Sequence, residues 1–260
     1  MIPHMQSLLG RIEAGTIGEA EVYALERAAA VRHERMPPGA LFCPVCQQAA
    51  VRFLPFGLAG RRQACCPRCG SLERHRFLWW VLGRHTDLLA RRHRVLHTAP
   101  EPCLRARIST LPGVDYLSVD RYDPAADIQA PLDRLPLDDA SRDVVLTSHV
   151  LEHLRDDRAA LRELARVLRP GGWMAVMVPY DPALPATLED PDLDDPAERL
   201  RRFGHPYHFR IYGADLPQRI AAAGFAVRVL DSRQVLSGHR RRRFRINRNH
   251  VLMCTRLAAG

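Results

Sequence analysis

The sequence contains no lysine, so all 38 of its basic residues are arginine. It has only two asparagines, and no apolar run reaches the roughly 18 residues that a membrane-spanning helix needs. Residues 1–10 do not combine a charged segment with an apolar one, so we expect no secretory signal, a cytoplasmic location and no membrane partner. Hydrophobic residues make up 47% of the chain, which is typical of globular proteins and excludes wholesale disorder.

The formal net charge of +9 suggests a polyanionic partner such as nucleic acid. Abundant arginine, alanine and proline without lysine also match the codon bias of a GC-rich genome, so part of this charge reflects composition. Thirteen arginines against seven acidic residues give residues 1–92 a charge of +6, and 25 against 22 give residues 93–260 a charge of +3. Charge alone therefore does not decide between classes of partner.

Five of the seven cysteines lie between Cys43 and Cys69, and four of them form two Cys-x-x-Cys pairs, Cys43 with Cys46 and Cys66 with Cys69. This spacing lets a tight turn aim two sulfurs at one ion, and four thiolates close a tetrahedron with no open position. The pattern predicts a structural zinc site. Disulfides or redox-active thiols are the alternative, and disulfides are disfavoured in a chain without a secretion signal. Cys65 could replace Cys66, but only Cys66 keeps the two-residue spacing to Cys69.

The rest of the chain divides into helical and strand-like segments. Helices are expected at residues 17–35, 72–90, 103–111, 156–169 and 213–223. Strands are expected at residues 95–98, 116–119, 127–128, 144–147, 173–178, 225–230 and 250–255. Strands separated by helices imply an α/β fold with a parallel, doubly wound sheet. We predict a helical segment at 1–36, a zinc-binding module at 37–75, a linking helix at 76–92 and an α/β domain at 93–260.

Ligands of doubly wound sheets bind outside the carboxyl ends of the strands. Four groups of residues should share that edge: Thr98 to Glu101, Asp120, Ser148 with His149, and Tyr180 with Asp181. Asp120 lies 21 residues beyond Ala99, a suitable distance for a carboxylate that binds ribose hydroxyls. A plain turn residue is the alternative interpretation of Asp120.

Five segments carry a resemblance to a known family: residues 95–101, 118–120, 135–145, 148–153 (SHVLEH) and 161–172 (LRELARVLRPGG). Together they resemble the class I S-adenosylmethionine-dependent methyltransferases, over about residues 93–260. With the two cysteine pairs and residues 71–76, the chain is similar to a bacterial subgroup that carries an N-terminal zinc module. The resemblance implies a Rossmann-like fold, S-adenosylmethionine as cofactor and Zn²⁺ as a structural ion.

The resemblance also implies cofactor contacts: Asp120 at the ribose, Asp127 and Ile128 at the adenine, and Ser148 and His149 beneath the methionine part. The loop after the first strand departs from the family pattern. Its residues His97, Thr98, Ala99, Pro100 and Glu101 include no glycine, and His97 stands where the family has an acid. We interpret it as a variant cofactor loop. The alternative is a protein that kept the fold and lost the cofactor.

Methyl transfer from a sulfonium uses an activated reagent, so the protein mainly aligns the acceptor and excludes water. A base helps when the acceptor is protonated at neutral pH, as a hydroxyl is. We predict His149 as this base, assisted by His208 or Tyr180; a helix-start residue bonded to the backbone is the alternative for His149. Residues 205–210 lie in an insertion where the family often builds its acceptor pocket.

Three functions fit the sequence. The first is a methyltransferase for a small-molecule or glycan-type acceptor. The second is an RNA methyltransferase, favoured by the basic first segment and the Arg240–Arg248 cluster with Phe244, and disfavoured by the acidic loop at 189–195 and by the absence of a recognised RNA-binding fold. The third is a non-catalytic binding module on the same fold. The sequence carries no signal for an oligomeric state.

Overall fold

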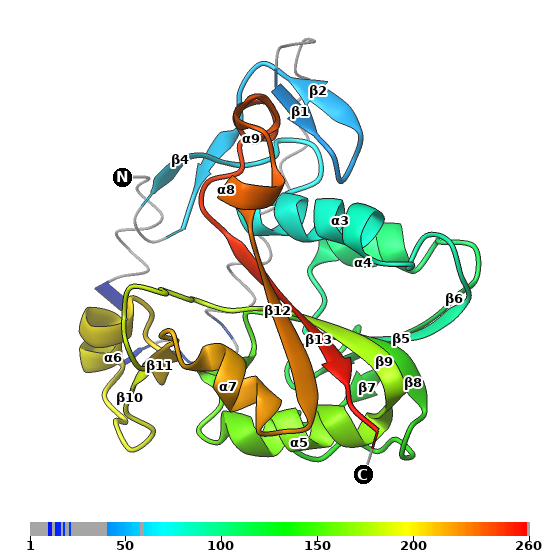
Figure 1. Ribbon diagram of the computed structural model, residues 1–260. Helices are drawn as coiled ribbons and strands as arrows, with labels where there is room; N and C mark the ends of the chain where they lie inside the picture. The colour runs from blue at the N-terminus through cyan, green and yellow to red at the C-terminus, as the bar shows by residue number, and fades with distance from the viewer. Residues whose placement is uncertain are drawn as a thin grey trace. The chain divides into compact units, whose positions relative to one another are not determined.

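The computed structural model describes residues 10–11, 14–16, 18, 21, 41–57 and 60–258 (Figure 1). The helix expected at 17–35 lies outside the described residues, apart from single positions. The chain forms two compact units that interleave along the sequence. Unit 1 comprises residues 1–90, 101–111 and 231–249, and unit 2 comprises residues 91–100, 112–230 and 250–260. The domain limits expected from the sequence stay a prediction.

A seven-stranded sheet forms the centre of unit 2, in the order β12-β13-β9-β8-β5-β6-β7. Its strands are β5 (His93–Thr98), β6 (Val114–Asp120), β7 (Ile128–Gln129), β8 (Arg142–Ser148), β9 (Leu168–Met177), β12 (Phe225–Asp231) and β13 (His250–Arg256). The pairs β5–β6, β5–β8, β6–β7 and β8–β9 are parallel, and β13 is antiparallel to β9. This mostly parallel sheet with helices confirms the predicted α/β, doubly wound fold class.

The remaining elements of unit 2 follow the strands. They are η1 (Leu151–His153), α5 (Asp157–Val167), β10 (Leu188–Glu189), α6 (Pro196–Phe203), β11 (Arg210–Ile211) and α7 (Leu216–Ala221). The core joins Leu96 and Val145 of the sheet to Leu161 and Leu164 of α5 and Ile220 of α7. Burial of each such side chain contributes about 1.5–3 kcal/mol to the stability of the fold. This core therefore fixes the positions of the strands.

The boundary between α5 and β9 differs from the expected one. The sequence predicts a helix to residue 169 and a strand from 173, but α5 ends at Val167 and β9 begins at Leu168. The register of β8 against β9 shifts between Arg142 and Val144. A Cβ on Gly172 would lie 2.8 Å from the Asp143 carbonyl oxygen. The glycine therefore permits a close backbone approach, and the strand starts earlier than its apolar residues indicate.

Unit 1 consists of short elements. They are β1 (Leu41–Cys43), β2 (Gln48–Ala50), β3 (Leu54–Phe56), β4 (Arg61–Cys65), α3 (Glu73–His85), α4 (Pro102–Ile108), α8 (Ser232–Val235) and α9 (Gly238–Phe244). The pairs β1–β2 and β3–β4 are antiparallel. Helix α9 packs against β1, where the rings of Phe42 and Phe244 lie 6.0 Å apart. No helix among the described residues is long and apolar enough to cross a membrane.

Candidate functional site

The order of the parallel strands reverses between β5 and β8, so the carboxyl ends of these neighbours form the switch point of the sheet. A non-glycine residue with positive φ follows each strand: Ala99 at 43° and His149 at 56°. Both keep a ladder hydrogen bond, because Ala99 N donates to Val119 O and His149 N to Met177 O, each at 2.8 Å. A left-handed conformation costs an L-residue about 1–2 kcal/mol, and such strain concentrates at functional sites.

The backbone conformation of Ala99 shows how the first loop forms its turn without a glycine. The chain adopts there a backbone conformation that favours glycine, but it does so with an alanine. Beside it, Thr98 is buried, and so is Ser148 at the end of β8. Within the part of the chain that the structure describes, neither side-chain hydroxyl has a hydrogen-bond partner. Buried hydroxyls normally have partners, so these two strand ends fit a polar ligand.

Asp120 is the last residue of β6 and is buried. Its Oδ1 accepts hydrogen bonds from the backbone N–H groups of Tyr122 at 2.7 Å and Asp123 at 3.0 Å. These bonds fix the orientation of the carboxylate. A carboxylate has about four acceptor positions, so this oxygen pair retains capacity for a ligand's hydroxyls.

Asp127 has a structural contact that the sequence did not predict. Its Oδ2 accepts from both the backbone N–H of Ser118 at 2.8 Å and the Ser118 hydroxyl at 2.6 Å. Its own N–H donates to the Ser118 hydroxyl oxygen at 3.0 Å. Asp127 therefore anchors the loop before β7 onto β6. Ile128 is half-buried and packs against the core. The predicted adenine contact of both residues stays a prediction.

The other predicted residues of the first loop lie in different environments. His97 is fully buried inside β5, and its Nδ1 lies 3.0 Å from the hydroxyl of Tyr116. Pro100 is buried as well. Glu101 belongs to unit 1, where its Oε1 lies 3.3 Å from Nε2 of His75. The Nδ1 of His75 accepts a hydrogen bond from Leu72 N at 3.2 Å.

His149, the predicted base, forms a pair with Glu152. Its Nδ1 lies 2.8 Å from Glu152 Oε1, and the Glu152 side chain is fully buried. Burial alone would raise the pKa of Glu152, but the adjacent His149 and then His153 hold that pKa below its ordinary value. An ionised carboxylate that orients an imidazole is the usual arrangement of a general base. Sequence analysis missed Glu152 as a site residue, although its three-residue spacing from His149 was a signal.

Three further histidines cluster next to this pair: His153, His205 and His208. Their candidate ligand nitrogens all lie within 4.8 Å of one another. Burial, followed by the charges of the neighbouring imidazoles, lowers the pKa of His208 well below its ordinary value, so this ring is neutral. Its Nε2 lies 4.0 Å from Glu152 Oε1. Tyr180, the other predicted helper, packs its ring edge-on against His250, with centroids 5.0 Å apart.

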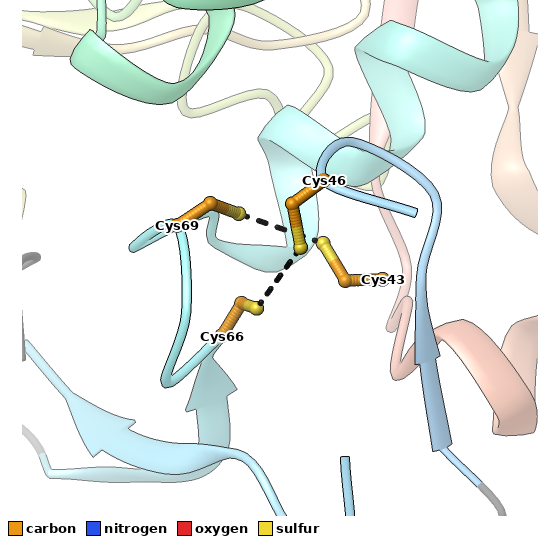
Figure 2. Close-up of side chains that lie close together, drawn as sticks. All are labelled: Cys43, Cys46, Cys66 and Cys69. Atoms are coloured by element: carbon orange, nitrogen blue, oxygen red, sulfur yellow. Dashed lines mark hydrogen bonds between the residues drawn. The ribbon is translucent and has the colours of Figure 1, made fainter. Parts of the chain in front are cut away.

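In unit 1 the structure brings together the four cysteines of the predicted zinc site (Figure 2). The Sγ atoms of Cys43 and Cys69 are 3.6 Å apart, and those of Cys46 and Cys66 are 3.8 Å apart. A zinc–sulfur bond of about 2.3 Å gives a tetrahedron with an edge of about 3.8 Å. The four sulfurs therefore fit a tetrahedral zinc ion.

The surroundings of the cluster distinguish its members from Cys65. The Cys43 Sγ lies 3.1 Å from the hydroxyl of Ser71, a neighbour outside the cluster. Gly70 has a φ of 71°, and its N–H donates to Cys66 O at 3.0 Å. This bond closes the turn that contains Cys66 and Cys69. Cys65 lies on β4 outside the four-cysteine group, and burial raises the pKa of its thiol to about 12. Cys65 is therefore a buried neutral thiol.

Arg76 links the cysteine module to the C-terminal helix of unit 1, and sequence analysis missed it. Its guanidinium is buried and donates to the backbone carbonyls of Phe244 at 2.7 Å and Arg245 at 2.9 Å, at the end of α9. It also donates to the carbonyls of Ala64 and Ser71. One buried cation thus satisfies four carbonyls, two of which are the orphan groups of a helix end.

Comparison with known proteins supports a methyltransferase. Residues 83–176 match the family described as a methyltransferase domain. The chain is 39% identical over 106 residues to the "probable S-adenosylmethionine-dependent methyltransferase Rv3030" of Mycobacterium tuberculosis, which covers 40% of this chain and 34% of that protein. A similarly named protein of Mycolicibacterium smegmatis is 38% identical over 109 residues, covering 41% and 37%.

The crystal structure of YcgJ from Bacillus subtilis is similar at 20% identity and a TM-score of 0.47, over 69% of this chain and 99% of that one. The chain spans about one third of the length of the curated relatives that it matches. The matched region contains the ends of β5, β6 and β8. The sequence matches show that this part of the chain is similar to S-adenosylmethionine-dependent methyltransferases.

Proposed function

We propose that the protein is an S-adenosylmethionine-dependent methyltransferase for a small-molecule or glycan-type acceptor. The observation that carries this proposal is the sheet edge at the switch point. There Ala99 and His149 adopt left-handed conformations after adjacent parallel strands, and the buried Asp120 ends the next strand. Ligands of doubly wound sheets bind at this edge, and all three residues lie in the segment that matches a methyltransferase domain.

In this proposal, the cofactor is bound by groups that the strand ends present. The oriented carboxylate of Asp120 accepts hydrogen bonds from the ribose hydroxyls, and the hydroxyls of Thr98 and Ser148 offer further polar contacts. Asp127 and Ile128 line the adenine side at the start of β7. The left-handed turn at Ala99 brings backbone close to the ligand in place of the usual glycine. His97, Pro100 and Glu101 are the remaining proposed cofactor-binding residues of this loop.

Bound S-adenosylmethionine supplies an activated methyl group, so the protein's own chemistry concerns the acceptor. His149 is placed to remove the proton of an acceptor hydroxyl, because its Nδ1 is held by Glu152 and its Nε2 is the remaining basic atom. The side chain of His149 is 28% exposed, so it is open to an acceptor. His208 and Tyr180 are the proposed helpers.

The charge of unit 2 favours an acceptor that is not a polyanion. Unit 2 has 18 arginines against 20 acidic residues, a net charge of −2. Most of the acidic residues in the loop at 189–195 already form ion pairs: Glu189 with Arg210 and Arg219, Asp190 with Arg202, and Asp194 with Arg155. This loop is therefore close to neutral but offers no excess of positive charge to phosphate groups.

We also propose that Cys43, Cys46, Cys66 and Cys69 hold a structural zinc ion in unit 1. The sulfur spacing supports this, and four thiolate ligands leave no open position for catalysis. A zinc tetrathiolate carries a charge of −2, and the buried guanidinium of Arg76 lies in the same module as a compensating cation. The ion would organise short strands that bury little apolar surface on their own.

Calorimetric titration with S-adenosylmethionine and with its demethylated product tests the cofactor proposal. Asp120→Asn keeps an oxygen acceptor for the loop but removes the charge, so affinity should fall by about 1.5–3 kcal/mol, the cost of losing hydrogen bonds to a charged group. Asp115→Asn, an exposed residue on the same strand, is the matched control. If the unmodified protein binds neither compound, the non-catalytic binding module becomes the better description.

One structural observation favours RNA as an alternative acceptor. The Arg240–Arg248 cluster belongs to the same compact unit as the cysteine module, because Arg76 bonds to the end of α9. Unit 1 has 20 arginines against nine acidic residues, a net charge of +11. Arg240, Arg242 and Arg243 are exposed on α9. The positive excess of the whole chain therefore lies in one unit.

Binding to single-stranded RNA at several salt concentrations tests this alternative. If α9 contacts phosphates, replacing Arg240, Arg242 and Arg243 by glutamine should reduce the slope of log K against log salt by about 2, at roughly 0.7 per phosphate contact. Replacing Arg158, Arg162 and Arg201 of unit 2 by glutamine is the control. Equal reductions in the two triple variants would indicate non-specific attraction and leave the small-molecule acceptor favoured.

A further inference from the structure

A cluster of three histidines lies beside the predicted base of unit 2, and none of the three is among the predicted cofactor contacts. His153 ends η1, directly after the carboxyl end of β8. His205 and His208 lie in the segment between α6 and β11. Their ring centroids are 4.4, 4.6 and 5.2 Å apart in the three pairs. Two chain segments more than fifty residues apart in the sequence therefore bring their three imidazole rings close together.

The backbone around the cluster brings these rings together. Helix α6 ends at Phe203, and its C-cap residue Gly204 has a φ of 76°, which turns the chain directly before His205. Phe209 N donates to Glu152 O at 2.9 Å, which fixes the second segment to η1. His205 is 9% exposed, and His208 has a side chain 12% exposed. The rings are therefore held by the fold and shielded from water.

We infer that His153, His205 and His208 form a binding site for a divalent transition-metal ion such as Zn²⁺. Imidazole nitrogen suits zinc and its neighbours in the first transition row. Three histidine ligands leave a fourth position open, in contrast to the closed set of four cysteines in unit 1. Imidazoles bind metals in their neutral form.

Glu152 supplies the anionic partner that such a site needs. Its fully buried carboxylate lies 2.8 Å from His149 Nδ1 and 4.0 Å from His208 Nε2. Metal-bound histidines commonly direct their second nitrogen to a carboxylate, which raises their basicity as ligands. A buried carboxylate also requires positive charge nearby. An ion held by the three histidines provides it.

Metal binding requires one local change. Tyr207 N donates to His205 Nδ1 at 3.2 Å, so this nitrogen carries the lone pair in the metal-free ring. Whichever nitrogen of His205 binds the ion, this bond must break, because either Nδ1 becomes the ligand or it takes the proton. The backbone N–H of Tyr207 therefore reports directly on metal binding.

The position of the ion suggests its use, and this step rests on the proposed methyltransferase function. The site directly follows the strand end that presents His149. An acceptor oxygen in the open position would have its pKa lowered by the metal, and His149 would take its proton. Metal binding itself does not depend on this step, since it is measured without cofactor or acceptor.

The test is the zinc content of the full-length protein after equilibration with Zn²⁺ in a weak chelating buffer. We expect two zinc ions per chain, and an X-ray absorption spectrum that needs a nitrogen shell as well as a sulfur shell. His205→Gln and His153→Gln should each lose one ion, whereas His239→Gln, at an exposed position on α9, should lose none. In the unmodified protein, Zn²⁺ should also shift the amide resonance of Tyr207.

A single zinc ion with an all-sulfur shell in the unmodified protein would overturn the proposal, and so would two ions in both His205→Gln and His153→Gln. The absorption spectrum needs no variant, so misfolding of a variant cannot hide the result. If the protein binds only one zinc ion, the calorimetric titration can still show cofactor binding. If it does not bind the cofactor, the measurement of zinc content can still show the second ion. The two proposals are therefore tested separately.

Discussion

Unit 2 is built around a seven-stranded sheet whose core is mostly aliphatic, although it also buries the charged side chains of Glu152 and Arg210, and its charges nearly cancel. Unit 1 has strands of three to five residues and fully buries the side chain of Arg76. Small modules bury too little apolar surface to be stable on that basis alone. We therefore expect the short strands of unit 1 to depend on the contacts of Arg76 and on the proposed zinc ion, whereas the sheet of unit 2 is held mainly by packing.

Removing the proposed zinc ion should have the largest effect on stability. That effect should be confined to unit 1. Cys43→Ser with Cys46→Ser should unfold unit 1, because structural zinc in small modules contributes about 10–16 kcal/mol. Hydrogen exchange should then show lost protection in β1, β4 and α9, and retained protection in β5, β8 and β9. Cys65→Ser is the control and should be mild. Equal loss of protection in Cys65→Ser would mean that the wrong cysteines were assigned.

Arg76→Met should have the next largest effect, again confined to unit 1. The substitution keeps the length of the side chain but removes the donor groups that bind the carbonyls of Phe244 and Arg245, at a cost of about 1–3 kcal/mol for a group left unsatisfied. We expect a lower free energy of unfolding and early hydrogen exchange in α9. Arg84→Met, an exposed position on the same helix, is the control. An unchanged exchange rate in α9 would show that Phe42 and Phe244 suffice to hold it.

His149→Asn tests the chemistry of unit 2 without touching unit 1. Asparagine tolerates the left-handed backbone at this position but cannot act as a base. If the acceptor is a hydroxyl, turnover should fall roughly 100-fold, the typical contribution of a positioned base. Cofactor affinity and zinc content of unit 1 should not change. A variant that weakens cofactor binding but keeps full turnover at saturation would make His149 a residue of the cofactor pocket.

The smallest expected effect is on Ala99, and its sign is informative. Relief of the left-handed conformation by Ala99→Gly should stabilise unit 2 by about 1–2 kcal/mol, reduced by the 0.5–1 kcal/mol that glycine's extra freedom in the unfolded chain costs. Ala159→Gly, inside helix α5, should instead destabilise by about 1 kcal/mol. Chemical denaturation of both variants measures the difference. Two destabilised variants would show that the Ala99 side chain makes contacts that outweigh its strain.

The sequence predicts local features well. Apolar runs alternating with helical periodicity indicate the doubly wound sheet, and the two-residue cysteine spacing identifies the four sulfurs that the structure brings together. Both signals depend on neighbours in the chain. The predicted start of β9 was wrong. The Pro-Gly-Gly segment is typical of a helix end, but it forms the first part of a strand with a shifted register.

Features that depend on distant residues were not predictable. The ring of His153 lies next to that of His205 only because two separate loops meet. The contact of Arg76 with Phe244 joins residues 168 positions apart. Arginine is abundant throughout this chain, so no sequence signal distinguishes Arg76 from the exposed ones. Only the fold shows that it is buried.

The bonds from Arg76 to Phe244 and Arg245 also bear on the order in which the protein folds during synthesis. The cysteine module emerges early from the ribosome, but the carbonyl groups that its buried guanidinium requires emerge only after nearly the whole of unit 2 has been made. Until then, Arg76 lacks two of its partners, and unit 1 stays incomplete while the sheet strands appear. A chain released before residue 245 would contain the cysteines but would lack the Arg245 carbonyl group that Arg76 binds.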